Sequence, residues 1–317
     1  MAHEVETMAY NKTETPWHGL GVPVLGDLTP EQMLKEAKLD WTVELRPTYY
    51  SIGMENIPTR PTGDSALIRS SDNRLLSTVS GNWNPVQNQE AAEFFNDFVA
   101  EGGMTMETAG SLCNGELVWF LAKMNESFDV FKHKDEIDSY LLFTNPHRYG
   151  WSTSVSLTAI RVVCMNTLNM SLNSTKGDKI IRVNHRREFV AEEVKEVLGV
   201  SKEKMKQYKE AAQFLASKKA KGEDIIEYFK RIFPVVTTKV ESKKDMSKMA
   251  TMAVDALQSQ PGADIAPGTW WNTYNAVTFV LDHKAGRGVD SRLNSAWYGE
   301  GRKKKIQALN LAVELAS

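Results

Sequence analysis

Cysteine is scarce in this chain, and the short motifs that mark many enzymes are missing. The 317 residues include only two cysteines, Cys113 and Cys164, which fit buried thiols in a reducing cytosol and cannot form the disulfide framework of a small secreted domain. The sequence contains no CxxC, no HExxH and no cluster of histidine with aspartate, so we expect no metal site. It also lacks the GxxxxGK[ST] and GxGxxG loops that bind nucleotide phosphates, so we expect no cofactor.

Long apolar runs are missing too. No uninterrupted apolar stretch approaches the ~20 residues that a membrane-spanning helix requires. The first residues, MAHEVETMAYNKTETPWHG, are polar and acidic, unlike a signal peptide. The apolar fraction of 42% and the charged fraction of 25% are ordinary for a soluble globular protein. We therefore expect a cytoplasmic protein with no membrane partner.

Charge is distributed unevenly along the chain. Residues 1–175 carry 12 Lys and Arg against 22 Asp and Glu, residues 176–248 carry 19 against 12, and residues 249–317 carry 7 against 6. The near-neutral total of −2 therefore combines an acidic first half with a basic middle. This asymmetry indicates a polyanionic partner, or subunits that meet acidic face to basic face. A long solvated helix rich in lysine is the alternative.

Segments with strand-like patterns flank three turn signals, at residues 71–73, 113–115 and 145–150. Asn114 and Gly115 tolerate positive φ, which favours a tight hairpin, and the other two signals contain Asp, Asn, Pro or Gly. The sequence DKIIRVNH (178–185) indicates one further strand. The chain up to residue 187 therefore predicts a sheet built of β-hairpins.

Helical periodicity dominates after residue 187 and occurs twice before it. Thr29 followed by Pro30 is a typical helix start, and residues 87–101 have an amphipathic pattern. Helices are expected at residues 30–38, 87–101, 189–220, 223–232, 242–259, 269–285 and 302–316. The predicted fold is therefore α+β, with an antiparallel β-hairpin sheet packed on a helix, followed by an all-helical C-terminal region. The expected parts are an irregular N-terminal arm (1–26), an α+β core domain (27–187) and a helical domain (188–317).

The loop of the last predicted hairpin, NPHRYGW (145–151), combines a cation with three rings. Aromatic faces stack on bases of any sequence, and arginine pairs with phosphate or stacks as a planar cation. Loops on a sheet scaffold often carry binding residues. Arg148, Tyr149 and Trp151 are therefore candidate nucleic-acid-binding residues. The alternative is a turn whose aromatic side chains simply cover the sheet.

A basic strand and turn follow further along the chain, with the cations Lys179, Arg182, Arg186 and Arg187. Together with Arg148 and Arg161 they are predicted to line a groove that follows a phosphate backbone, because non-specific affinity for nucleic acid comes largely from charge neutralisation. For Arg161 a buried hydrogen-bonded network is the favoured alternative. Residues 302–305 (RKKK) are a second cationic run, for which binding and simple solvation are both open.

An enzymatic alternative depends on histidine. His18, His147 and His185, with scattered carboxylates, are the candidates for a general base in a nucleic-acid-processing enzyme. His18 has no second histidine close to it in sequence, so we expect it to be structural. The sequence therefore assigns no catalytic residue.

Five segments carry motifs: PWHGLG (16–21), VSGNWNPVQNQEAAEFF (79–95), RVVCMNTL (161–168), WWNTYNAVTFVLDH (270–283) and SAWYGEGRKKKIQALNLA (295–312). Taken in order, they resemble a phage- and plasmid-like family, the domain of unknown function 932. The resemblance extends over nearly the whole chain and implies a phage, prophage or plasmid origin, and with it a location in the host cytoplasm. Trp83 stands where the family usually has a tyrosine-like aromatic. The resemblance supplies no catalytic residues.

The expected fold is also similar to the Rad52-like single-strand annealing proteins, which form rings or filaments that hold single-stranded DNA in a basic groove. We therefore expect a non-enzymatic protein of DNA recombination that binds single-stranded DNA, anneals strands and self-assembles into a homo-oligomer. The alternatives are a nucleic-acid-processing enzyme and a phage protein that binds and modulates a host protein.

Overall fold

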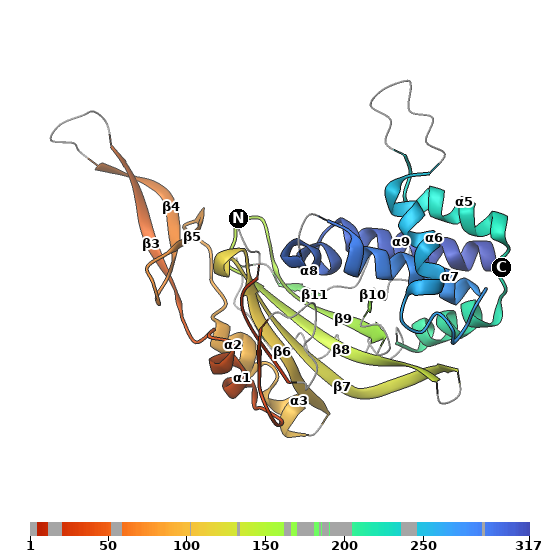
Figure 1. Cartoon of the computed structure of the whole chain (residues 1–317). Helices are drawn as coiled ribbons and strands as arrows, with labels where there is room; N and C mark the ends of the chain where they lie inside the picture. Colours follow the sequence, from red (N-terminus) through yellow and green to blue (C-terminus); the bar gives the residue numbers. More distant parts are fainter. Residues whose placement is uncertain are drawn as a thin grey trace. The chain divides into compact units, whose positions relative to one another are not determined.

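The computed structural model describes residues 5–11, 21–51, 59–101, 103–131, 134–161, 166–169, 181–183, 185, 190, 205–235, 246–286 and 289–317. The chain divides into two compact units. Unit 1 comprises Met1–Asn125, Leu141–Ser156 and Lys179–Val197, and unit 2 comprises Glu126–Tyr140, Leu157–Asp178 and Leu198–Ser317. The fold is α+β, as predicted, with antiparallel sheets and a helical C-terminal region (Figure 1).

Two sheets contain the described strands. The larger has the order β10-β9-β8-β7-β6-β1-β2, and β11 also pairs with β9. Its strands are β1 (Val5–Tyr10), β2 (Val22–Pro23), β6 (Met104–Leu112), β7 (Leu117–Phe131), β8 (Lys134–Pro146), β9 (Thr153–Arg161), β10 (Asn166–Asn169) and β11 (Ile181–Val183). The smaller sheet has the order β3 (Val43–Ser51), β4 (Thr59–Arg69) and β5 (Leu75–Ser80). The predicted hairpins are confirmed, because the three turns join β4 to β5, β6 to β7 and β8 to β9, and each pair is adjacent in its sheet.

Residues 5–10 were expected to be irregular, but they form β1, which pairs antiparallel with β6. The sequence VETMAY does not alternate between apolar and polar residues, and only its last three residues are buried. The strand is therefore held mainly by backbone pairing with a partner about a hundred residues away, which periodicity does not reveal. Trp17 and His18 lie in residues 12–20, outside the described part of the chain.

The helices of unit 1 are α1 (Pro30–Glu36), α2 (Asn88–Glu93) and α3 (Asn96–Ala100). Helix α1 begins as predicted, with a capping box in which the Gln32 backbone N–H donates to Thr29 Oγ1 at 3.2 Å and the Thr29 N–H donates to Gln32 Oε1 at 2.9 Å. The single helix expected at 87–101 is instead broken between α2 and α3. The break allows Phe94 and Phe95, which are adjacent in sequence, both to be buried, at 2% and 0% exposure.

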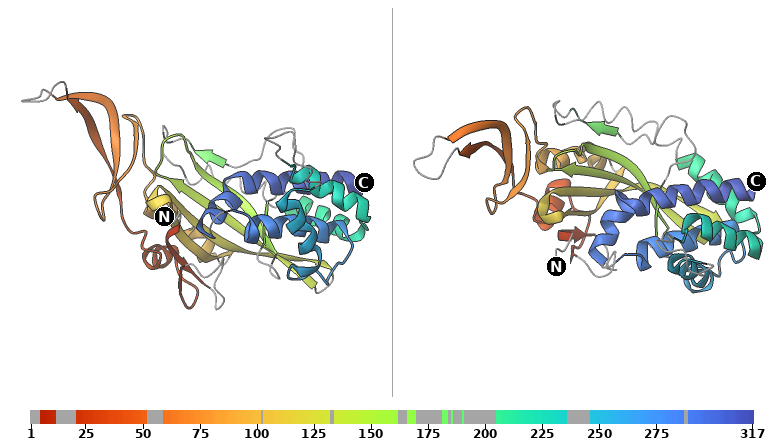
Figure 2. Two further views of the ribbon diagram at one scale, coloured as in Figure 1. Left: turned by 45° about the horizontal axis from the view of Figure 1, so that its top comes forward. Right: turned by 90° about the horizontal axis from the view of Figure 1, so that it is seen from above.

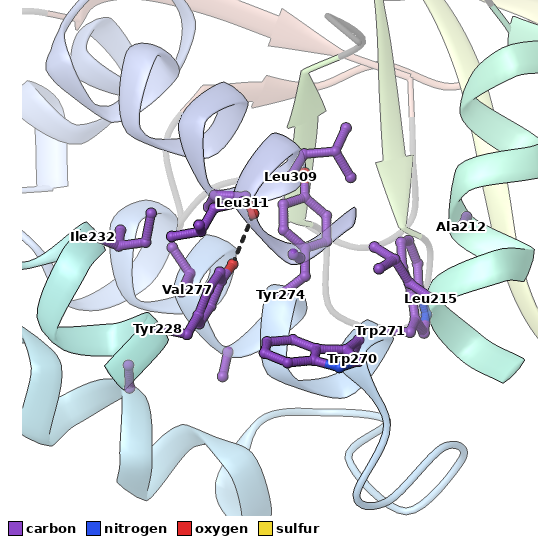
Figure 3. Close-up of a cluster of buried hydrophobic side chains, with 14 of the residues drawn as sticks. Ala212, Leu215, Tyr228, Ile232, Trp270, Trp271, Tyr274, Val277, Leu309 and Leu311 are labelled. Carbon is purple, nitrogen blue, oxygen red and sulfur yellow. Dashed lines mark hydrogen bonds between the residues drawn. The ribbon is translucent and has the colours of Figure 1, made fainter. Parts of the chain in front are cut away.

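Unit 2 has a helical core. Its helices are residues 205–217, α5 (Gly222–Ile232), α6 (Lys248–Ser259), α7 (Trp270–Phe279), the π-helix η3 (Val280–Lys284), α8 (Val289–Trp297) and α9 (Glu300–Ala316). Helix α8 lies between the two last predicted helices and was missed by the prediction. Figure 3 shows Tyr228, Trp270 and Tyr274 in the core, where the Tyr228 hydroxyl donates to the backbone oxygen of Ala308 at 3.0 Å. None of the described helices is long and apolar enough to cross a membrane.

Arg69 ties the smaller sheet to β1 and to the β4–β5 turn. Its guanidinium donates two hydrogen bonds to Glu6, at 2.7 and 2.9 Å, and two to Asp72, at 2.9 and 2.7 Å. The hydrogen bonds from Arg69 lower the pKa of the Asp72 carboxyl to about 2. Gly115 leaves the room for this guanidinium, because a Cβ there would lie 2.6 Å from Arg69 Nη1.

Replacing Arg69 with alanine is expected to lower the free energy of unfolding by about 2 kcal/mol, because a bidentate, largely buried ion pair is broken. The loss stays below the cost of breaking a fully buried pair, since the side chains of Glu6 and Asp72 are 24% and 44% exposed and water can solvate them. The control is Arg46→Ala, which removes an exposed pair with Glu44 and is expected to cost less than about 1 kcal/mol. Urea denaturation of both variants measures the difference, and equal losses would contradict the assignment.

Candidate nucleic-acid interface

The loop between β8 and β9 is anchored by a buried polar network. Asn145 Nδ2 donates to the Val86 backbone oxygen at 2.9 Å and to Asn88 Oδ1 at 3.3 Å. His147 Nε2 lies 2.9 Å from the same Asn88 oxygen. Thr153, the first residue of β9, reaches Asn145 Oδ1 at 3.5 Å. The network therefore holds both ends of the loop against Val86 and against Asn88, the first residue of α2.

The hydrogen bonds fix the tautomer of His147. Asn88 Nδ2 donates to the backbone oxygens of Leu39 and Trp41, at 3.0 and 3.4 Å, so its Oδ1 is an acceptor and the His147 Nε2–H must donate to it. The imidazole is 0% exposed and meets the Trp41 ring edge-on, with the ring centroids 5.3 Å apart. Burial, and to a smaller extent the neighbouring His185, lower the pKa of His147 to about 3. The ring is therefore neutral at pH 7 and structural.

The outer side of the loop carries the cation and the rings that the sequence singled out. Tyr149 is 67% exposed, and its backbone N–H is fixed by Ser77 Oγ at 3.2 Å. The Arg148 guanidinium lies 5.9 Å from the centroid of the half-buried Trp151 ring and 3.5 Å from the Glu116 carboxylate. Gly150, with φ of 81°, makes the turn between them. The loop thus presents one free aromatic face and one cation that Glu116 partly neutralises.

Strand β11 brings a second cation to this end of the sheet. It pairs antiparallel with β9, with Arg182 opposite Ser154 and Val183 opposite Thr153. Arg182 is exposed, and its partner residue Ser154 is three positions from Trp151. The pairing therefore places part of the basic strand beside the loop, although the two segments are about thirty residues apart in sequence.

His185, two residues after this strand, contacts the segment GNWNPVQN (81–88). The His185 ring stacks on Trp83, with centroids 3.9 Å apart and planes at 12°. The Asn84 N–H donates to the His185 backbone oxygen at 2.6 Å, and His185 Nδ1 lies 3.1 Å from the Asn84 backbone oxygen, so it carries the proton. Burial lowers the pKa of His185. The sequence identifies Trp83 and Asn84 only as part of a family motif. It contains no signal that these two residues position the basic strand.

The structure brings together four of the eight predicted binding residues, Arg148, Tyr149, Trp151 and Arg182. Arg161 lies at the other end of β9, opposite Asn166 of β10, and its side chain is outside the described part. Lys179, Arg186 and Arg187 are also outside the described residues.

The four cations of residues 302–305 do not form one surface, because Lys303 is exposed whereas Lys305 is fully buried in an ion pair with Asp282. Within the described ranges, no three His, Cys, Asp or Glu side chains gather as metal ligands.

A family model described as a domain of unknown function (DUF932) matches residues 75–297. The chain belongs to this family. The match includes the GNWNPVQN segment, the β8–β9 loop and β11, so every described part of the interface lies inside the family domain. Comparison with curated proteins and with solved structures found no match. Family membership therefore assigns no activity, and the similarity to Rad52-like annealing proteins stays a prediction.

Proposed function

We propose that this protein binds single-stranded DNA and anneals strands, as a recombination protein of phage type, through the cation–aromatic surface formed by Arg148, Tyr149, Trp151 and Arg182. The observation that carries the proposal is the pairing of β11 with β9, which sets Arg182 beside the loop that bears the aromatic side chains. Proteins that bind single strands without sequence preference combine these two elements, a cationic track for phosphates and exposed rings for bases.

The individual side chains suit different parts of a strand. The exposed ring of Tyr149 is free to stack on a base, and the fixed backbone N–H limits the conformational entropy lost on binding. Arg182 is exposed for phosphate contact. Arg148 is held over Trp151 and exchanges Glu116 for a phosphate when DNA binds, because both groups present oxygens to the same guanidinium.

The enzymatic alternative has less support. His147 and His185 are 0% and 2% exposed, and burial lowers the pKa of both. A general base must reach the proton that it abstracts, and neither ring is accessible. His18 lies outside the described residues, so the alternative depends on a residue without an assigned position.

Fluorescence anisotropy with a labelled oligo-dT tests the proposal. The wild-type protein is expected to bind at low salt and to lose affinity steadily as salt rises, with a logarithmic slope of about −0.7 for each phosphate neutralised. Tyr149→Ala is expected to weaken binding by about tenfold through lost stacking, and Arg182→Ala to weaken it and to make the slope shallower by about 0.7. Tyr49→Ala, at an exposed tyrosine of β3, is the control and leaves binding unchanged. Absence of binding at low salt, or binding that does not respond to salt, would overturn the proposal.

A further inference from the structure

Among the described residues, nothing covers the far half of the β3–β4 hairpin, which is a two-stranded ribbon. Beyond the pair Asp64–Ser80, where β5 ends, β3 is the partner of β4 in the described part of the chain. In β3 only Val43 is buried, and Tyr49 and Tyr50 are 59% and 48% exposed. In the views of Figures 1 and 2 no other described element of unit 1 lies beside this half of the ribbon. A two-stranded hairpin is marginally stable in water unless something packs on it, so the ribbon indicates a missing partner.

One face of the ribbon pairs an aromatic ring with a cation. Tyr50 lies directly opposite Arg60 in the antiparallel register, so the two side chains share a face. Arg60 is exposed and has no ion pair among the described residues, whereas Arg46 is neutralised by Glu44 at 2.8 Å. Within the described ranges, the charged residues of this half of the ribbon are Arg60 and Asp64, so this half carries no net positive charge. It therefore lacks the cation excess that a nucleic acid would require, and a protein partner fits it better.

The complementary surface lies on the same unit, beside α1 and α2. A pocket of about 320 Å³ is lined by Trp41, Leu34, Lys35 and the carboxylates of Glu31, Asp40, Glu90 and Glu93. Four anions and one cation give the pocket lining a net charge of −3, and Trp41 and Leu34, which are 8% and 4% exposed, add a small apolar part to the lining. Its volume is at the small end of ligand sites, which suits one or two side chains rather than a large ligand. An arginine with a neighbouring tyrosine matches both its charge and its apolar part.

The ribbon of one molecule cannot enter the pocket of the same molecule. Thr42 lines the pocket and Val43 begins β3, so Tyr50 lies seven residues further along a paired strand. At ~3.3 Å per residue this is about 23 Å from the pocket, and pairing with β4 prevents β3 from folding back. A contact between this part of the ribbon and the pocket would therefore join two molecules.

We propose that the β3–β4 ribbon of one copy docks in the α1–α2 pocket of a second copy, with Arg60 among the carboxylates and Tyr50 against Trp41. The donor and acceptor surfaces differ, so each copy that accepts a ribbon still offers its own. Such a head-to-tail contact propagates and gives a ring where the rotation closes, or a filament where it does not. This contact is the proposed interface of the expected self-assembly, and it does not depend on DNA binding.

Charge reversal on each side tests the contact by sedimentation velocity over a concentration series, without DNA. The wild-type protein is expected to associate, and Arg60→Glu and the double change Asp40→Lys with Glu93→Lys are each expected to weaken association by at least about tenfold, because like charges meet. Glu31 and Glu90 are left in place, since Glu31 pairs with Lys35 and Glu90 caps α2. Arg74→Glu, in the β4–β5 turn, is the control and leaves association unchanged.

Mixing the two charge-reversed proteins is the decisive experiment for the contact. The reversed ribbon of one then meets the reversed pocket of the other, so association is expected to return towards the wild-type level. A wild-type protein that stays monomeric, an Arg60→Glu protein that associates normally, or a mixture that fails to recover would each overturn the contact. The DNA-binding test above has a separate readout, so a chain that assembles but binds no DNA refutes the proposed function and leaves this inference standing.

Discussion

Replacing Lys305 with methionine is expected to lower the free energy of unfolding by about 3–5 kcal/mol. Lys305 Nζ lies 2.8 Å from Asp282 Oδ1, and the two side chains are 0% and 3% exposed. Removing the cation leaves the Asp282 carboxylate buried without its counter-ion, which costs far more than the interaction of an exposed pair yields. Urea denaturation followed by the helical circular dichroism signal measures the loss.

The acidic partner of Lys305 lies in the π-helix η3 (Val280–Lys284). Asp282 is at the middle of η3, where the wider turn interrupts the α-helical spacing of α7. Burial lowers the pKa of Lys305, and Asp282 opposes that shift. Lys305 is therefore buried in an ion pair with Asp282 in the helical core, although its neighbours in the RKKK run face solvent at least in part.

Two further variants separate this explanation from a general effect of losing a lysine. Lys303→Met removes an exposed pair with Glu300, in which both side chains are 73% exposed, and is expected to cost less than about 1 kcal/mol. Adding Asp282→Leu to Lys305→Met is expected to restore much of the lost stability, because no buried charge then remains. A double variant no more stable than Lys305→Met alone would contradict the assignment.

Local signals account for the parts of the fold that the sequence predicted. The start of α1 was predictable because its capping box joins residues close together in sequence, Thr29 and Gln32. The β6–β7 hairpin was predictable because two adjacent residues, Asn114 and Gly115, adopt positive φ. Strand β1 was not predictable, because it is held by pairing with β6, which lies about a hundred residues further along the chain. The break between α2 and α3 is likewise set by burial of two adjacent phenylalanines, which overrides a continuous helical pattern.

In the candidate interface, too, the residues with local signals were predictable and those with long-range contacts were not. Residue types in the β8–β9 loop identified Arg148 and Tyr149 as binding candidates. The positioning residues were not identified, because their contacts join distant segments: His147 to Asn88, and His185 to Trp83 and Asn84. Sequence alone does not distinguish a buried lysine in a cationic run from its exposed neighbours. Lys305 was therefore interpreted together with the other cations of residues 302–305.

Acidification is expected to destabilise unit 1 through His147. The pKa of this imidazole is about 3 in the folded protein and 6.5 ordinarily, so below pH 6.5 the unfolded chain binds a proton that the folded chain does not. The stabilising contribution is therefore complete above pH 6.5 and is lost as pH falls towards 3. At ~1.4 kcal/mol per pH unit, the loss is about 2 kcal/mol at pH 5 and approaches about 5 kcal/mol at pH 3. Burial lowers the pKa of His185 in the same direction.

A His147→Gln variant isolates this contribution from the titration of carboxylates elsewhere. The glutamine amide retains a donor for Asn88 Oδ1 but does not titrate. The variant is expected to be less stable than wild type at pH 7, because a packed ring is lost, and to show a flatter dependence on pH between 6.5 and 4.5. The stability difference between the two proteins should therefore shrink as pH falls. A difference that stays constant over this range would mean that His147 gains its proton as readily in the folded protein as in the unfolded chain, and the ring would then have to be accessible to water.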